Sequence, residues 1–150
     1  RNRSHTRKGR CKMSDKVFMQ EAIDLARENV ANGARPFGAV LVKDGKVISR
    51  AVNRIEADQD PTAHAELLAL RAAGKALGHT RLDGATVYAS GQPCPMCLAA
   101  MRLAGITRIA FAYSNDNAAA FGMSTADIAA ELGRVPMLGV GAPTFGEVRG

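Results

Sequence analysis

Two short motifs, about thirty residues apart, most tightly constrain how this chain of 150 residues can fold. In the first motif His64 stands two residues before Glu66. The second is the run Pro93 to Cys97, in which two cysteines are three positions apart. Cysteines with that spacing at the start of a helix direct their sulfurs to one side, within reach of a single ion. If His64 binds the same ion, the fold must bring the two motifs together.

One imidazole and two thiolates form a Cys₂His donor set, which is typical of zinc. Zinc favours four tetrahedral ligands, so three protein ligands leave one position for water, whose pKa the metal lowers towards neutrality. Residues 62–77 are expected to form a helix, which would place the Glu66 carboxylate about 200° around the axis from His64. The spacing therefore predicts that Glu66 is a nearby proton shuttle and not a fourth ligand.

Two other interpretations of the cysteine pair are weaker. A redox dithiol of this spacing usually lies in a thioredoxin-like domain, a context that Pro95 between the cysteines does not resemble. A structural zinc site would need a fourth protein ligand, for which His79 is the one spare histidine outside the first twelve residues. His-x-Glu followed by Pro-Cys-x-x-Cys is instead the signature of zinc-dependent nucleobase deaminases.

The rest of the chain predicts alternating helices and strands in one domain. An initial helix capped by Ser14 carries apolar residues as far as Val30, and two apolar runs around Asp44-Gly45 predict a β-hairpin. Further along, the patterns predict strands at 85–89 and 108–113, and helices at 62–77, 95–105 and about 124–132. This order is typical of an α/β sandwich with a mixed sheet. Residues 135–150 could add a final strand or form a loose tail.

The net charge of +6 comes from one end of the chain. Residues 1–12 hold six of the 20 lysines and arginines and no acid, so 14 cations remain to balance 14 acids. We interpret residues 1–12 as a basic leader of vector or upstream origin, and residues 13–150 as the functional domain. RNA binders need a basic surface, so the neutral domain argues against a nucleic-acid partner.

Neither a membrane span nor a disulfide framework is expected. The longest uncharged stretch, Gly84 to Met101, is interrupted by glycine and proline. Three unevenly placed cysteines indicate a reducing, cytoplasmic environment.

From Met13 to about Leu132 the sequence resembles the cytidine-deaminase-like zinc superfamily. The runs Asp60–Glu66 and Pro93–Cys97 match the branch that contains bacterial guanine deaminases and tRNA adenosine deaminases. The resemblance implies a three-layer αβα fold with a five-stranded mixed sheet, assembled as a homodimer. It also implies hydrolytic replacement of an exocyclic amino group by oxygen, with release of ammonia. The implied site is one zinc ion on His64, Cys94 and Cys97, with Glu66 as the shuttle.

Three residues are expected to contact the substrate. The segment from Arg35 to Val40 looks like the corresponding segment of guanine deaminases, and its Phe37 could stack on a flat ring, although core packing explains it equally well. Asn53 matches an asparagine that hydrogen-bonds the substrate in this superfamily, but asparagine is also a common turn residue at a strand end. Ala65, between the two residues of the first motif, is the third.

The chain is nearer to the guanine deaminases of this branch, but one segment argues against guanine itself as the substrate. In guanine deaminases the stretch that resembles Phe121 to Leu132 carries adjacent acids, whereas here Ser124 and Thr125 occupy those positions and Asp127 is shifted along. Losing a carboxylate that binds donors costs several kcal/mol, which favours a smaller or differently decorated ring. Gln92 also replaces the glutamate that commonly precedes the Pro-Cys pair.

The sequence therefore predicts a deaminase of a free nucleobase or related small amino-heterocycle. The main alternative is a tRNA-specific adenosine deaminase. A non-catalytic zinc-binding scaffold would have no need of Glu66, and an RNA-binding module would depend entirely on the leader.

Overall fold

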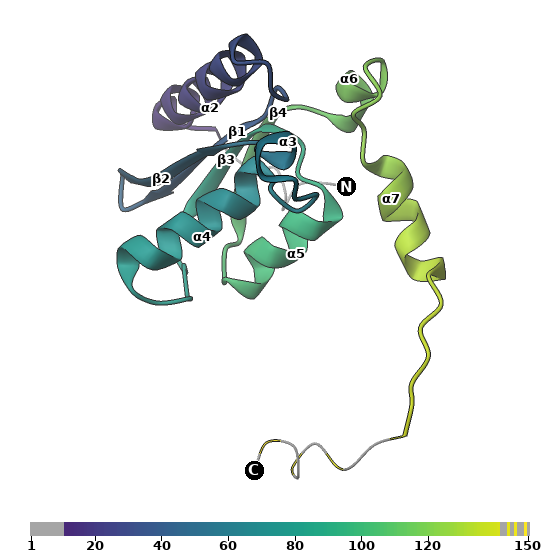
Figure 1. Cartoon of the computed structure of the whole chain (residues 1–150). Coiled ribbons are helices and arrows are strands. Elements are labelled where there is room, and N and C mark those ends of the chain that lie inside the picture. Colours follow the sequence, from purple (N-terminus) through teal and green to yellow (C-terminus); the bar gives the residue numbers. More distant parts are fainter. Residues whose placement is uncertain (1–10, 142–143, 145, 147–148, 150) are drawn as a thin grey trace.

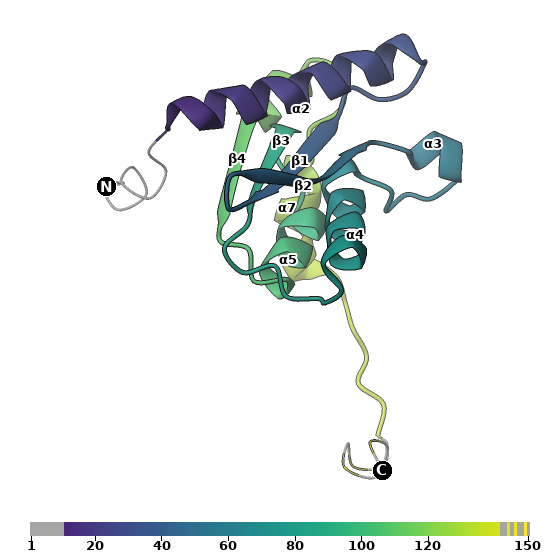
Figure 2. The same ribbon diagram turned by 90° about the vertical axis from the view of Figure 1, so that its left-hand side faces the viewer.

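The computed structural model describes residues 11–141, 144, 146 and 149. Its centre is a mixed four-stranded sheet of order β2-β1-β3-β4, in which β1 is antiparallel to both of its neighbours and β3 is parallel to β4. Helix α2 covers one face of the sheet, and α4 and α5 cover the other (Figures 1 and 2). The strands are β1 (Gly38–Lys43), β2 (Lys46–Val52), β3 (Thr86–Gly91) and β4 (Arg108–Tyr113). The helices are α2 (Met13–Ala31), α3 (Ile55–Asp58), α4 (Ala65–Leu77), α5 (Pro95–Leu103), α6 (Asn115–Ala119) and α7 (Ala126–Glu131), followed by the 3₁₀ turn η1 (Leu132–Arg134).

The three-layer arrangement is confirmed, but the expected fifth strand is absent from the described residues. After β4 the chain continues into α6 and α7, and the extended segment Val135–Val140 runs away from the body of the domain (Figure 1). Met137 in this segment is 93% exposed. Pro136 has no N–H to donate to a neighbouring strand, and Gly139 weakens a strand further. The sheet therefore ends at β4.

The predicted hairpin forms at Asp44-Gly45, where both residues have positive φ, 53° and 75°. Such a turn matches the right-handed twist of paired strands. Strand β1 is the centre of the core, because its alternate side chains pack on opposite faces. Val40 lies in the cluster under α2, and Leu41 lies in the cluster under α4 and α5.

The start of α2 differs from the prediction. Ser14 lies inside the helix, and the N-cap is Lys12, whose backbone N–H donates to the Asp15 carboxylate at 2.7 Å. Val30, predicted on the buried face, is half exposed. Asp15 is buried and accepts hydrogen bonds from the Tyr88 hydroxyl and from the Arg108 guanidinium, the latter at 2.7 and 2.9 Å. The first turn of α2 is thus tied to β3 and β4.

The buried charge network shifts the pKa values of all three of its members, and the hydrogen bond to Asp15 raises the pKa of Arg108. The Arg108 guanidinium holds the pKa of the Asp15 carboxyl well below its usual range. Burial, together with the hydrogen bond to Asp15, raises the pKa of Tyr88 to about 12.

No helix in the described part of the chain is long and apolar enough to cross a membrane.

Candidate active site

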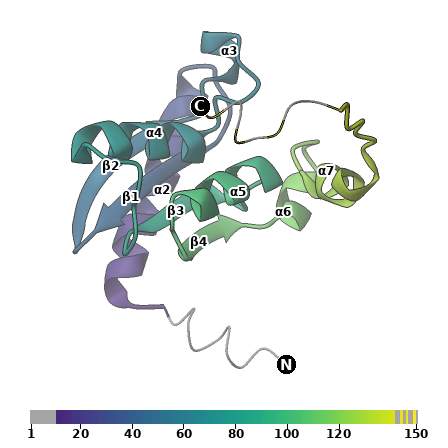
Figure 3. The same ribbon diagram turned by 90° about the horizontal axis from the view of Figure 1, so that it is seen from below.

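The two sequence motifs meet where α4 and α5 begin. These helices lie side by side on one face of the sheet (Figure 3). His64 was predicted inside the first of them, but it is the N-cap residue of α4, with extended backbone angles (φ −79°, ψ 151°). Cys94 is likewise the N-cap of α5, and Pro95 occupies the first turn, where its missing N–H costs nothing. Each helix therefore presents a metal-binding side chain at its start.

The three predicted ligands lie at the spacing that zinc requires. Nδ1 of His64 is 3.5 Å from Sγ of Cys94 and 3.6 Å from Sγ of Cys97. A tetrahedral ion with Zn–S of about 2.3 Å and Zn–N of about 2.1 Å would separate nitrogen and sulfur by about 3.6 Å. Both cysteines are buried and neither is in a disulfide. The donor set and its geometry fit a zinc ion.

His79 does not belong to this group. Within the described part of the chain, the residues whose ligand atoms converge are His64, Cys94 and Cys97. His79 follows the end of α4 and lines a separate groove between α4 and α5. The fourth protein ligand of a structural zinc site is therefore not supplied by His79.

The two thiols have opposite pKa shifts in the protein alone. Hydrogen bonds from Cys97 and His64 lower the pKa of Cys94 to about 4. The pKa of Cys97 is raised, because its thiol donates to Cys94 and because the site is buried. The hydrogen bond to Cys94 also raises the pKa of His64.

Glu66 lies in the first turn of α4 and is 7% exposed. The 200° separation from His64 does not apply, because His64 precedes the helix. Glu66 is outside the converging donor group, and its role as proton shuttle stays a prediction. Burial, which disfavours the charged form, raises the pKa of its carboxyl group.

A cavity of about 110 Å³ opens beside these residues. His64, Cys94 and Glu66 line it, together with Phe37 and Asn53 from the predicted substrate set. Phe37 also packs against the cluster of Ala39, Ala65 and Ala69, so it contributes both to the core and to the cavity. Ala65 itself is fully buried in that cluster and is not among the cavity-lining residues. Its contact with substrate stays a prediction.

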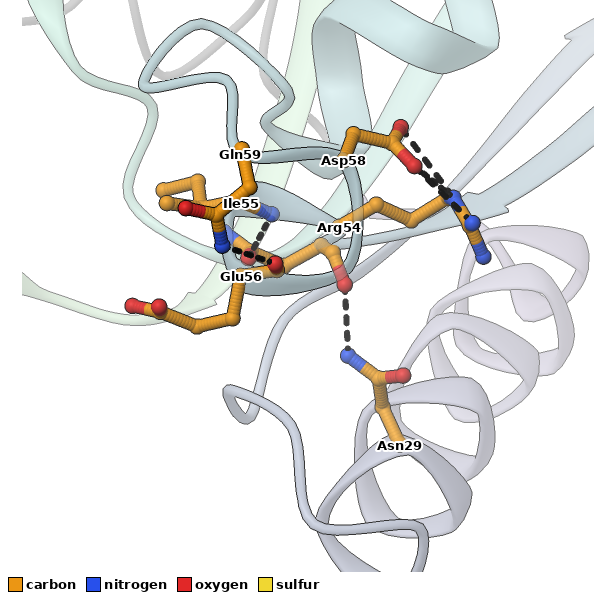
Figure 4. Close-up of polar contacts among 7 residues, drawn as sticks. Asn29, Arg54, Ile55, Glu56, Asp58 and Gln59 are labelled. Atoms are coloured by element: carbon orange, nitrogen blue, oxygen red, sulfur yellow. Dashed lines mark hydrogen bonds and ion pairs between the residues drawn. The ribbon is translucent and has the colours of Figure 1, made fainter.

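Asn53 is held in place by three hydrogen bonds. Its backbone N–H donates to the carbonyl of Phe37 at 3.1 Å, and its side-chain oxygen accepts from the N–H of Ile55 at 3.0 Å. Asn29 reaches across from α2 toward the loop that carries Arg54 and Ile55 (Figure 4), and its side-chain amide donates to the Asn53 carbonyl at 3.0 Å. Helix α2 therefore positions the loop that brings Asn53 to the cavity.

The segment after α6 forms another wall. Gly122, Met123 and Thr125 line the cavity, whereas the Ser124 hydroxyl accepts a hydrogen bond from the N–H of Ala126 and is not among the lining residues. Asp127 lies on α7 and is also not among them. Arg35, Ile55 and Met123 also line the cavity, although no hydrophobic period or motif spacing in the sequence marks them.

Comparison with known proteins agrees with this geometry. The family pattern of the cytidine and deoxycytidylate deaminase zinc-binding region matches residues 12–113. A guanine deaminase from Bacillus subtilis is 41% identical over 121 residues, which cover 80% of this chain and 78% of that protein. A tRNA-specific adenosine deaminase from the same organism is 45% identical over 97 residues, 65% of this chain and 60% of that protein.

A solved structure of a B. subtilis guanine deaminase has a TM-score of 0.78 at 38% identity and covers 85% of each chain. The chain belongs to the cytidine and deoxycytidylate deaminase family, whose members bind zinc and remove amino groups by hydrolysis.

Proposed function

We propose that this protein is a zinc-dependent deaminase that hydrolyses the exocyclic amino group of a free nucleobase or a related amino-heterocycle. The observation that carries the proposal is the placement of Glu66 in the same small cavity as His64 and Cys94, outside the metal-binding group. A scaffold that only bound zinc would need no buried carboxylate facing an open cavity, because burying such a group is costly.

His64, Cys94 and Cys97 would hold the metal, and Glu66 would move the protons. Bound zinc supplies Lewis acidity and lowers the pKa of a water molecule at its open position. The Glu66 carboxylate accepts a proton from the attacking water and delivers it to the ring nitrogen next to the reacting carbon. Glu66 then passes the second proton of the same water to the amino group, which leaves as ammonia, while the water oxygen remains on the ring. Phe37 and Asn53 would orient the ring.

Cavity size and charge support a small substrate. The volume of about 110 Å³ is well below that of cavities for drug-sized ligands, which are about 300–1,000 Å³. From residue 13 onward, 14 cations balance 14 acids, so the domain lacks the excess of positive charge that RNA binding favours. Guanine is disfavoured among free bases, because Thr125 lines the cavity where guanine deaminases carry an acid.

We also propose that the enzyme is a homodimer in the cytoplasm. Apolar side chains on α7 and beyond, including Ile128, Leu132 and Leu138, are more than half exposed, and a second copy would cover them. Free Cys94 and Cys97 are suited to a reducing compartment. Light scattering that gives the mass of one chain would contradict the dimer.

The activity is tested by measuring ammonia release by the zinc-loaded protein from a panel of substrates. The panel contains guanine, cytosine, adenine, other aminopurines, aminotriazines, their nucleosides and tRNA. We expect release from at least one free heterocycle. A second protein, which lacks residues 1–11, tests whether the basic leader contributes to activity. It retains Lys12, whose backbone caps α2, and its activity should equal that of the full chain. Activity confined to tRNA in both proteins would support tRNA deamination instead.

A further inference from the structure

The side-chain amide of Gln92 has a defined orientation at the rim of the cavity. Its Oε1 accepts a hydrogen bond from the backbone N–H of Asn115 at 2.8 Å. Its own backbone N–H donates to the carbonyl of Tyr113 at 2.7 Å, which fixes the residue at a second point. Because a backbone N–H can only donate, the amide oxygen must face Asn115, and Nε2 is the opposite end. Within the part of the chain that the structure describes, no group accepts a hydrogen bond from that nitrogen.

Asn53 repeats this arrangement on the other side. Its Oδ1 accepts from the backbone N–H of Ile55, and its Nδ2 donates to no described residue. Asn53 is 4% exposed, so its amide nitrogen is a donor in an almost fully buried residue of the cavity wall. The two amides come from the ends of β2 and β3, and in each a backbone N–H fixes the oxygen.

Asn53 and Gln92 therefore each direct a side-chain donor, and no side-chain acceptor, away from the backbone N–H that fixes them. Glu66 is the one carboxylate among the described residues that line the cavity, and the proposed reaction uses it to move protons. Arg35 adds a cationic donor, which also pairs with Glu56 at 3.1 Å. Thr125 donates its backbone N–H to Asn115 Oδ1 at 3.2 Å, so the same asparagine holds two elements of the rim.

We propose that Gln92 is a specificity-determining residue whose Nε2 donates a hydrogen bond to the substrate. The proposal rests on the proposed function. A donor at Gln92 would favour substrates that are neutral amino-heterocycles with a hydrogen-bond acceptor facing Gln92. The acceptor is a carbonyl oxygen or an unprotonated ring nitrogen. Gln92 is exposed at the cavity rim. A ring N–H at the same edge would face a donor and forgo this hydrogen bond, whose net contribution is about 0.5–1.5 kcal/mol.

The variant Gln92→Glu tests this role with minimal change of shape. One carboxylate oxygen can still accept from Asn115 N–H, while the other replaces the donating Nε2 by an acceptor. We use 2-aminopurine, whose N1 is an acceptor, and guanine, whose N1 carries a proton. The variant should lower kcat/KM for 2-aminopurine roughly tenfold, and the ratio of the 2-aminopurine value to the guanine value should fall further.

Gln20→Glu is the matched control. It introduces the same charge on the exposed face of α2. There the Gln20 side-chain amide donates a hydrogen bond to the Asp24 carboxylate, and Gln20 does not line the cavity. Both kcat/KM values should stay within twofold of wild type in this variant. Zinc content and Tm, measured on all three proteins, exclude a loss of folding as the cause.

A binding measurement separates the two proposals. 2-Aminopurine is fluorescent, so its Kd for the zinc-loaded protein can be measured by rapid mixing, before turnover consumes the ligand, and Gln92→Glu should raise that Kd roughly tenfold. Equal Kd values and an unchanged substrate ratio would overturn the role of Gln92 but leave the deaminase intact. Failure of wild type to bind 2-aminopurine would overturn the acceptor-edge class. Absence of ammonia release from every heterocycle would overturn the deaminase itself.

Discussion

The region where α4 and α5 begin and the region after β4 both border the cavity, yet they are packed very differently. Glu66, Cys94 and Cys97 are each at most 8% exposed and lie against the cluster between the sheet and the two helices. Beyond β4, large apolar side chains are exposed, from 37% at Met123 to 93% at Met137. Thr125 is joined to the rest of the site through Asn115.

This difference separates chemistry from selection of the substrate. A metal site needs donors held within a few tenths of an ångström, and close packing around the helix starts supplies that precision. The wall formed by residues 122–125 can change with little effect on the core, because none of these residues belongs to a buried core cluster. The resemblance to guanine deaminases leads us to expect adjacent acids in this wall, and this chain has Ser124 and Thr125 there instead.

The largest expected effect is loss of the metal. In Cys94→Ser, which removes a buried thiolate ligand, we expect zinc content to fall from about one per chain to near zero and ammonia release to fall to background. Cys11→Ser is the matched control, because Cys11 is exposed and outside the donor group. Metal analysis of the purified proteins gives the answer. Cys94→Ser protein that retains one zinc per chain would show that Cys94 is not a ligand.

Substituting one methionine in each region tests the difference in packing between the core and the segment after β4. Met101 is fully buried beside Cys97, whereas Met137 is 93% exposed. Met101→Ala should lower the free energy of unfolding by about 2–5 kcal/mol, and Met137→Ala by less than about 0.5 kcal/mol. Urea unfolding followed by circular dichroism measures both values. Equal losses would mean that the region after β4 is as well packed as the core.

A smaller effect is expected on the opposite face of the sheet, at Asp15. Its folded pKa lies below the ordinary 3.8, so the carboxylate stabilises the fold above that pH and loses its contribution as the pH falls further. Asp15→Asn should therefore cost about 1–3 kcal/mol at pH 7, and the difference from wild type should shrink below about pH 4.

The exposed Asp24→Asn, on the same helix, is the control and should show neither effect. Urea unfolding at several pH values measures both variants. A difference between Asp15→Asn and wild type that stayed constant down to pH 2 would argue against a salt bridge to Arg108.

The sequence was most informative where a local pattern determines the structure. The hairpin follows from Asp44-Gly45, and Pro95 marks the start of α5. The metal ligands were predictable because their chemistry restricts residue type and spacing so strongly. Even there, the helix was predicted to begin before His64. The alanine-rich run after it has helical propensity, whereas the extended backbone of His64 depends on tertiary contacts.

Non-local features were not predictable in the same way. The fifth strand was implied by the resemblance, and the sequence of residues 135–150 left a final strand or a loose tail open. Residues 135–140 contain a proline and a glycine that weaken a strand. The cap that Asp15 forms with Lys12 is local, but its ion pair with Arg108 joins residues that are far apart in sequence. The orientation of the Gln92 side-chain amide could not be predicted from the sequence, because it depends on a hydrogen bond from the backbone N–H of Asn115.

The central claim is that Glu66 moves protons in a hydrolytic deamination at a zinc site that it does not help to form. The direct test is ammonia release by Glu66→Gln, with zinc content measured on the same sample and the exposed Glu28→Gln as control. We predict about one zinc per chain in all three proteins, and a loss of turnover of about 10²–10⁴-fold in Glu66→Gln alone. Turnover by Glu66→Gln within a few-fold of wild type would contradict the claim.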